Sequence, residues 1–192
     1  MKHLLLLFFS FTTFLAFAED EILLKNGTKA LIKPNTFRVD YNERKISYQI
    51  DGSSKEVTIL FQDFDWVTVG INKFQTFKFE GSSVIEGYFV LSETSTKKLI
   101  FRSYQEEDSS VVKYSFYIVD NNNKVLDFHA FDNGTNKKSI TQRSEIFLKI
   151  RYYFSECTEM LQRLEVYDQY SSDLNHNRIL LFFKAPIYYN CK

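Results

Sequence analysis

Between Glu21 and Phe131 the chain is a series of short apolar alternations separated by turn residues, with almost no periodicity of 3.6 residues. Phe37, Val39 and Tyr41, for example, alternate with polar neighbours. This pattern is typical of strands with one face exposed to solvent. About ten such segments follow one another at spacings of roughly 8–12 residues. The sequence therefore predicts a mainly β fold, an antiparallel meander that forms a barrel or a sandwich.

Turn signals separate these segments. Asn26-Gly27 lies between two apolar runs, and this dipeptide tolerates the two positive φ angles of a type I′ hairpin. A cluster of Asp and Asn at residues 120–123 ends a later strand in the same way. Both positions are predicted to be tight connections between antiparallel strands.

After Gly134 the pattern becomes helical. An apolar stripe between Ile146 and Phe154 predicts an amphipathic helix over about 139–154, and Met160 and Leu164 belong to a second stripe. Ser155 and Thr158 are candidate caps between these two helices. A third element covers about 174–184, and its pattern fits a helix or a strand. A helical C-terminal part of two or three helices is thus expected to pack on the sheet.

The first eighteen residues have the pattern of a cleavable secretory signal. Lys2 precedes an apolar run from Leu4 to Phe17, and Ala16-Phe17-Ala18 fits the small-x-small motif before a cleavage site. We therefore expect an exported protein, periplasmic or secreted, whose residues 19–192 form a single domain. Its β-rich body would cover 19–135 and its helical part 136–192.

The charge balance limits the partners of the chain. The sequence has 24 Lys and Arg against 24 Asp and Glu. Nucleic-acid binding needs a basic surface, so this balance argues against a nucleic-acid partner. After the signal the longest apolar run, Ile179 to Phe183, is far too short to span a membrane. We expect no integral membrane span once the signal is cleaved.

Aromatic residues are abundant, with 20 Phe and 12 Tyr. That content suits a sugar-stacking surface or a cavity for an apolar ligand. The codons of Phe, Tyr, Ile, Asn and Lys are rich in A and T, so an A/T-rich genome produces the same bias without a functional cause. Composition alone leaves both explanations open.

The two cysteines, Cys157 and Cys191, predict a disulfide. Export places them in an oxidising compartment, and an even count favours pairing. The alternative, a Cys–His nucleophile pair with His129 or His176, has no supporting local signature.

Catalytic and metal-binding motifs are absent from the sequence: it has no Gly-x-Ser-x-Gly, no His-Glu-x-x-His, no glycine-rich phosphate loop and no Cys or His pair at metal spacing. Asp63 and Asp65, spaced i and i+2 on a predicted strand, are the best candidates for a Ca²⁺ site or an acid/base pair. A solvent-exposed strand face explains them equally well. His129 is expected to be a hydrogen-bonded strand residue, and His176 a residue of a helix start or a loop. We therefore predict no catalytic residues, no metal ligands and no cofactor.

Short motifs within residues 60–192 resemble a group of uncharacterised exported proteins of Gram-negative bacteria. They are the segment Phe74–Lys78, the strand opening Gly87-Tyr88-Phe89, a Lys-rich amphipathic helix and the terminal pair Tyr189-Asn190. The resemblance implies a β-rich body with a helical C-terminal part and a cell-envelope setting. It implies no activity, and the two cysteines are not part of it.

These observations favour a non-catalytic binding or interaction module of the cell envelope, with another envelope protein as its partner. A second hypothesis is a carrier that holds a small apolar ligand in a β-barrel cavity. The third is an enzyme of unknown class, with Asp63 and Asp65 as its acidic pair. An enclosed cavity would favour the carrier, and a filled interior with an exposed aromatic patch would favour the interaction module.

Overall fold

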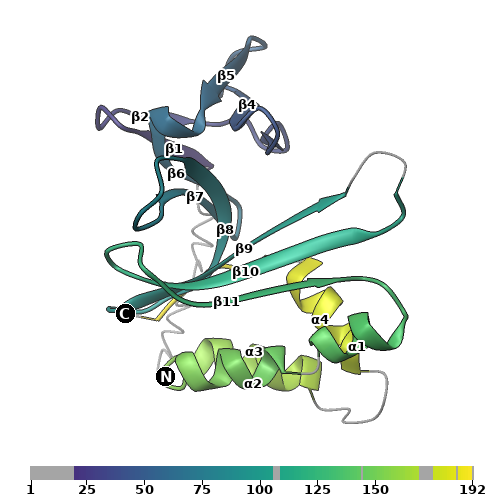
Figure 1. Cartoon of the computed structure of the whole chain (residues 1–192). Helices are drawn as coiled ribbons and strands as arrows, with labels where there is room; N and C mark the ends of the chain where they lie inside the picture. The colour runs from purple at the N-terminus through teal and green to yellow at the C-terminus, as the bar shows by residue number, and fades with distance from the viewer. Residues whose placement is uncertain (1–19, 106–108, 144, 169–174, 185, 192) are drawn as a thin grey trace, which may run out of the picture.

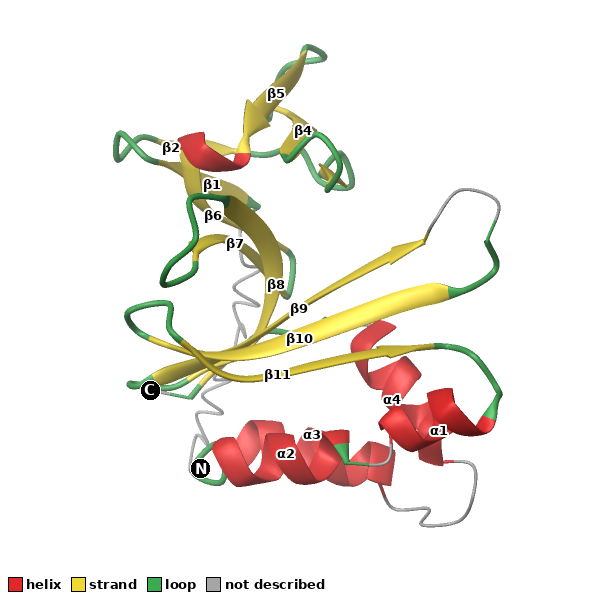
Figure 2. Cartoon of the chain, in the orientation of Figure 1, coloured by secondary structure: helices red, strands yellow, loops and turns green. Residues whose placement is uncertain are grey.

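The structure, a computed structural model, describes residues 20–105, 109–143, 145–168, 175–184 and 186–191. It is mainly β, with 46% strand and 22% helix, and the helices follow the strands in the chain (Figure 1, Figure 2). The predicted β-rich body with a helical C-terminal part is confirmed. The predicted signal, residues 1–18, lies outside the described residues.

A large sheet of nine strands forms the centre of the molecule. Eight of them have the order β11-β10-β9-β8-β7-β6-β1-β2, and all neighbours are antiparallel. Their bounds are β1 Glu21–Leu24, β2 Lys29–Leu31, β6 Phe64–Val69, β7 Asn72–Lys78, β8 Ile85–Glu93, β9 Lys97–Gln105, β10 Val112–Asp120 and β11 Val125–Asp132. From β6 to β11 every strand pairs with the next one in the chain, which is the predicted meander. The ninth strand, β12 (Tyr189–Asn190), runs parallel to the end of β8.

A second sheet has three strands, β3 (Arg38–Asp40), β4 (Lys45–Gln49) and β5 (Glu56–Leu60), followed by a 3-10 helix, η1 (Phe61–Asp63). Its buried side chains share a core with β1, β6 and β7. In the described part of the chain the two sheets make a sandwich-like arrangement and no closed barrel. This decides between the two β architectures that the sequence left open.

Among the described residues after β11, the chain forms four helices. They are α1 (Lys137–Arg143), α2 (Ile146–Tyr153), α3 (Thr158–Asp168) and α4 (Asn175–Lys184). The single helix predicted over 139–154 is therefore wrong, because the chain forms α1 and α2 there. The apolar stripe begins only at Ile146, and α1 buries the polar Ser139 and Arg143 instead. The element that was undecided, at about 174–184, is the helix α4.

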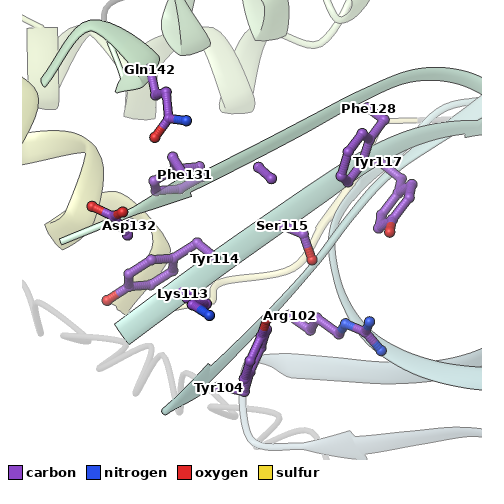
Figure 3. Close-up of a pocket in the computed structure, with 11 residues that line it drawn as sticks. Arg102, Tyr104, Lys113, Tyr114, Ser115, Tyr117, Phe128, Phe131, Asp132 and Gln142 are labelled. Carbon is purple, nitrogen blue, oxygen red and sulfur yellow. The ribbon is translucent and has the colours of Figure 1, made fainter. Parts of the chain in front are cut away.

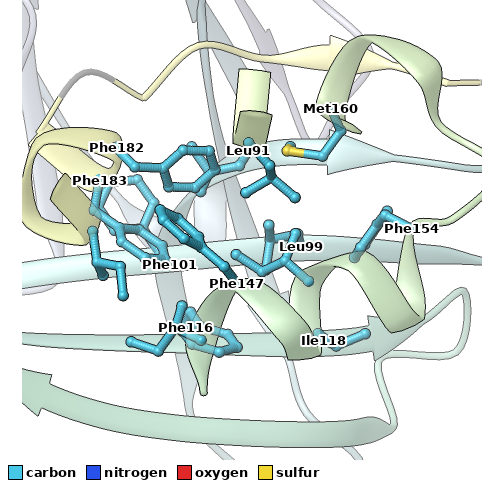
Figure 4. Close-up of a cluster of buried hydrophobic side chains, with 14 of the residues drawn as sticks. Leu91, Leu99, Phe101, Phe116, Ile118, Phe147, Phe154, Met160, Phe182 and Phe183 are labelled. Carbon is cyan, nitrogen blue, oxygen red and sulfur yellow. The ribbon is translucent and has the colours of Figure 1, made fainter. Parts of the chain in front are cut away.

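Two groups of elements, the small sheet and the helices, cover one face of the large sheet. A row of aromatic residues crosses four neighbouring strands on this face, at Phe74, Phe89, Phe101 and Phe116. The small sheet packs over the Phe74 end. The helices cover the other end, where Phe101 and Phe116 contact Phe183 of α4 (Figure 4).

The opposite face of the sheet is curled inward, and its interior is filled. A backbone hydrogen bond from Glu80 to Asn123 joins the connection after β7 to the turn after β10. Phe79 thereby packs on Tyr117, with ring centroids 5.1 Å apart. Beneath this contact lies a cluster of almost fully buried side chains, namely Phe77, Tyr88, Val90, Ile100 and Val119.

The hairpin between β1 and β2 differs from the predicted type I′ turn. Only Gly27 has a positive φ, of 83°, whereas Asn26 does not. Gly27 N–H donates to Leu24 O, and Leu24 N–H donates to Thr28 O, so the loop is longer than two residues. The Asn26 side chain accepts a hydrogen bond from Thr28 N–H, which lets Asn26 keep a negative φ.

Candidate functional site

A groove of about 300 Å³ lies on β9, β10 and β11, on the same sheet face as Tyr117 and the curl (Figure 3). Register places most of its residues in three rows across the strands, while Tyr114, Phe131 and Gln142 line it from outside these rows. The middle row, which begins with Arg102 on β9, continues with Ser115 and Ala130. Because the last two side chains are small, this row forms the floor of the groove.

Aromatic residues stand on both sides of this floor. On one side Tyr117 lies directly opposite Phe128, with ring centroids 4.7 Å apart. On the other side Tyr104 lies opposite Lys113, whose Nζ is 5.9 Å from the centre of the tyrosine ring. Tyr104 is 41% exposed and Phe128 is 46% exposed. The groove therefore offers aromatic surface to solvent, whereas the aromatic residues on the opposite face of the same strands are buried.

Arg102 closes the inner end of the groove. Its Nη1 donates to Glu86 Oε1 at 2.9 Å, and its guanidinium lies 5.4 Å from the centre of the Tyr88 ring. Its Nε is buried and has no hydrogen-bond partner among the described residues. Arg102 is therefore held in place while one of its donors is unused.

The charge of Glu86 is stabilised by its neighbours. Tyr88 OH donates to Glu86 Oε2 at 2.7 Å. Burial by itself would raise the pKa of Glu86, but the hydrogen bond from Tyr88 and the charge of Arg102 outweigh it and hold that pKa below its ordinary value. Burial and the bond to Glu86 raise the pKa of the Tyr88 phenol. At neutral pH this end of the groove holds an ionised carboxylate, an ionised guanidinium and a neutral phenol.

Ser115 and His129 are not arranged as a nucleophile and its base. Ser115 lies on the groove floor, whereas His129 lies on the opposite face of the sheet and stacks on Phe116 with ring centroids 5.7 Å apart. The Nε2 atom of His129 is hydrogen-bonded to Gln142 O in α1. His129 is thus the hydrogen-bonded strand residue that the sequence predicts, and it is not a base for Ser115. His176 belongs to the first turn of α4.

The predicted pair of carboxylates does not share a strand. Asp63 ends the 3-10 helix η1, and only Asp65 belongs to β6. The alternation that suggested one common face is interrupted by this turn of helix. Asp65 forms an ion pair with Lys25 instead. The expected common face for a metal ion or an acid/base pair is therefore wrong.

The structure brings Cys157 and Cys191 together in the predicted disulfide, with Cα atoms 5.3 Å apart. Glu159 is the third member of a possible metal-binding group with the two cysteines. Since both sulfur atoms are used in the disulfide, this group does not offer thiolate ligands. Cys157 also precedes α3 directly, and its carbonyl accepts the hydrogen bond from Leu161 N–H. It occupies the cap position for which Ser155 and Thr158 were the candidates.

A second polar cluster holds the C-terminal segment. Glu93, which is buried, accepts from Lys73 Nζ at 2.8 Å and from Tyr188 OH at 3.1 Å, and Lys98 Nζ lies 3.5 Å from its other oxygen. Burial and the nearby Glu93 charge raise the pKa of Tyr188. Because Tyr188 N–H also donates to Ile71 O, this cluster fixes residues 186–191 to the sheet. Because its charges pair with one another, we interpret this cluster as stabilising the fold.

The sequence did not reveal the groove residues. The alternation along β9, β10 and β11 shows which side chains share a face, but the register that aligns Arg102, Ser115 and Ala130 is set only by pairing in three dimensions. The sequence feature that pointed to such a surface was the unusual number of aromatic residues. Composition, however, does not show which rings are buried and which are exposed.

Two further observations concern identity and membrane association. No family model, curated protein or solved structure matches the chain. Among the described helices, none has the length and apolar character needed to cross a membrane.

Proposed function

We propose that the chain is an exported, non-catalytic binding module of the bacterial cell envelope, and that the groove on β9–β11 is its recognition surface. One observation carries this proposal: the strands of the groove expose Tyr104 and Phe128 on one face, while the aromatic residues of the other face are buried under α2, α3 and α4. Exposed aromatic side chains grouped in a hollow are typical of binding surfaces.

Export is supported by two independent features. The first eighteen residues have the composition of a secretory signal. The Cys157–Cys191 disulfide suits an oxidising compartment, which is where such bonds persist. The resemblance to exported proteins of Gram-negative bacteria agrees with this setting and leads us to propose the cell envelope.

The carrier hypothesis is less well supported. A carrier needs an enclosed apolar cavity, but the curled face is filled by Phe77, Tyr88 and Ile100. A hollow of about 590 Å³ beside Ile71 and Tyr188 is open to solvent and not enclosed. The enzyme hypothesis relied on Asp63 and Asp65 sharing one strand face, and they do not share a strand. The interaction module therefore remains the function that the geometry supports best.

Site-specific photo-crosslinking in cells tests the proposal. A benzophenone amino acid placed at Tyr104 or Phe128 inserts into C–H bonds of whatever molecule occupies the groove. Tyr152 of α2 is the matched control, since it is an aromatic residue that is 78% exposed on the helical part. We expect a discrete adduct from both groove positions and none from position 152, measured by electrophoresis and mass spectrometry of the purified chain.

Two patterns of adducts would contradict the proposal. If positions 104 and 128 give no adduct in cells that export folded, disulfide-bonded protein, the groove is not the recognition surface. Equal adducts from all three positions would show that the groove has no selectivity, and the proposal would be wrong.

A further inference from the structure

The free edge of β11 is a second interaction surface of the molecule. β11 is the last strand of the large sheet: it pairs with β10 on one side, and no described strand pairs with it on the other. We infer that a second copy of the chain adds its own β11 to this edge in antiparallel orientation, so that the two large sheets become one. Such pairing does not depend on what the groove binds.

The edge of β11 has little of the protection that keeps sheet edges from pairing. Short length or exposed charge protects many edges, and β2, at the opposite end of the sheet, has only three residues. β11 has eight residues, and its apolar Val125, Leu126 and Phe128 are 38%, 43% and 46% exposed. The nearby charge of Asp127 is bonded to Lys149 of α2. A long apolar edge of this kind favours pairing with another strand.

The ladder between β10 and β11 shows which backbone groups the edge offers. Asn133 N–H donates to Val112 O, so every second residue of β11 bonds to β10. The backbone groups of Phe128 and Ala130 therefore point away from β10. Asp127 Oδ1 accepts from Phe128 N–H at 2.8 Å, whereas Ala130 N–H and Phe128 O have no bond to another described residue. A donor and an acceptor thus remain two residues apart on the same edge.

This spacing makes the edge complementary to itself. When two antiparallel copies of β11 meet with His129 opposite His129, each Ala130 lies opposite Phe128 of the other copy. Each Ala130 N–H then donates to Phe128 O of the other copy, which gives two hydrogen bonds related by a two-fold axis. The same register sets each exposed Phe128 ring beside a small, exposed Ala130 side chain on the face of the groove.

A second copy also completes the groove. The floor row runs through Arg102, Ser115 and Ala130 and stops at the free edge of β11. In the paired register the row continues with Phe128 of the second copy and then with its Tyr117, because these two residues lie opposite each other. Each chain therefore supplies an aromatic wall at the open end of the other chain's groove. The groove of a single chain lacks this wall.

Sedimentation velocity of the disulfide-bonded mature protein tests the pairing. One pair of strands makes a small interface, so we expect a dissociation constant of about 10–100 µM, with monomers at about 1 µM and mostly dimers at about 500 µM. Amide hydrogen exchange locates the contact. Exchange at Ala130 should slow as the concentration rises, because its N–H becomes bonded to the second copy. Exchange at Phe128 should change less, since Asp127 already accepts from that N–H.

Two variants separate pairing from folding. Ala130→Pro removes an N–H that points away from β10, so it should abolish the dimer and leave the β10–β11 ladder intact. Phe128→Lys places a charge on the edge and should raise the dissociation constant at least about tenfold. Leu31→Lys is the matched control: this leucine is 44% exposed on the opposite edge strand, β2, and the change should leave the dissociation constant within about twofold.

Several results would overturn the inference. It is wrong if the folded protein stays monomeric at about 500 µM, if both β11 variants dimerise like the natural chain, or if Leu31→Lys weakens the dimer as much as they do. A monomeric chain that gives an adduct with another protein from Phe128 in cells would reject the second copy and keep the proposed function. A dimer without any adduct to another molecule from Tyr104 or Phe128 would keep the pairing and reject the proposed function.

Discussion

Gly87 shows at the scale of a single residue how the fold depends on close packing of aromatic rings. The residue lies in β8, opposite Thr76 of β7. A Cβ atom at this position would overlap the rings of Phe74 and Phe61. These rings belong to the core that joins the two sheets. Glycine is therefore required at position 87 for space, while its backbone conformation is ordinary.

Gly87→Ala should lower the free energy of unfolding by about 1–3 kcal/mol, because overpacking forces the two rings to move. Urea denaturation of the mature protein measures this change. Gly70 is the matched control: it has a φ of 57° and open space around it, so Gly70→Asn should be tolerated, since asparagine adopts this conformation more readily than other residues. Gly87→Asn should be at least as damaging as Gly87→Ala. Equal effects at both positions would contradict the packing explanation.

Glu86 makes the stability of the folded protein depend on pH. Its pKa in the folded protein is held below the ordinary value of 4.5, so the folded state binds its proton less readily than the unfolded state does. The resulting stability is present above about pH 4.5 and is lost as the pH falls through the lowered pKa. Hydrogen bonds from Ser139 and Gly134 lower the pKa of Asp132 in the same direction.

We therefore expect the urea midpoint of the protein to fall on acidification from about pH 5 to pH 3. Glu86→Gln should reduce this fall, because the glutamine has no carboxyl proton to bind. A variant with the same acid sensitivity as the natural chain would show that Glu86 does not contribute. Glu43→Gln serves as a control at an exposed carboxylate of the β3–β4 turn.

At the scale of elements, periodicity predicted the strands better than their arrangement. The alternation at Phe37–Tyr41 and the stripe from Ile146 are local features, and the structure has a strand and a helix there. The 3-10 turn at Phe61–Asp63 and the short β12 carry no such pattern, because each depends on packing with distant residues. The groove was missed for the same reason: no local pattern reports the register of three strands.

Arg163 of α3 forms hydrogen bonds to α4 and to the segment that follows it. Its Nη2 donates to Phe182 O at 2.7 Å, near the end of α4, and its Nη1 donates to Ile187 O at 3.3 Å. The guanidinium also lies 4.3 Å from the centre of the Phe182 ring. The buried guanidinium thus donates to one carbonyl in the last turn of α4, where helix carbonyls have no partner within the helix, and to another beyond the helix.

Arg163→Met should destabilise the fold by about 1–3 kcal/mol, because it leaves buried carbonyl oxygens without donors. Hydrogen exchange should show the loss most clearly in α4, since Arg163 satisfies the end of that helix. Lys184→Met removes a positive charge from an exposed position of α4 and should have little effect. Similar exchange in both variants would show that Arg163 is not needed to hold α4.

At the scale of the whole molecule, the C-terminal segment fastens the helices to the large sheet. Tyr188 is bonded to Glu93 and to Ile71 O, β12 pairs with β8, and Cys191 is linked to Cys157 at the start of α3. Ser92 of β8 lies 3.2 Å from the Cys191 sulfur. One short segment therefore contacts β6–β7, β8 and the helical part.

Replacing both cysteines by serine should lower the free energy of unfolding by about 3–4 kcal/mol on the loop-entropy model. Serine at position 157 can still accept a hydrogen bond at the start of α3, so the change mainly removes the covalent link. Urea denaturation of the double variant, compared with oxidised and reduced natural protein, measures the effect. A difference below about 1 kcal/mol would show that noncovalent contacts of the segment suffice.

The covalent link also has a kinetic consequence. From β6 to β11 each strand pairs with its neighbour in the chain, so the sheet is built from contacts that form early in folding. The pairing of β12 with β8 joins residues far apart in the sequence and forms late. A late contact alters the rate of unfolding more than the rate of folding. Oxidised and reduced chains should thus refold at similar speeds, while the oxidised chain opens more slowly and survives longer in the presence of proteases.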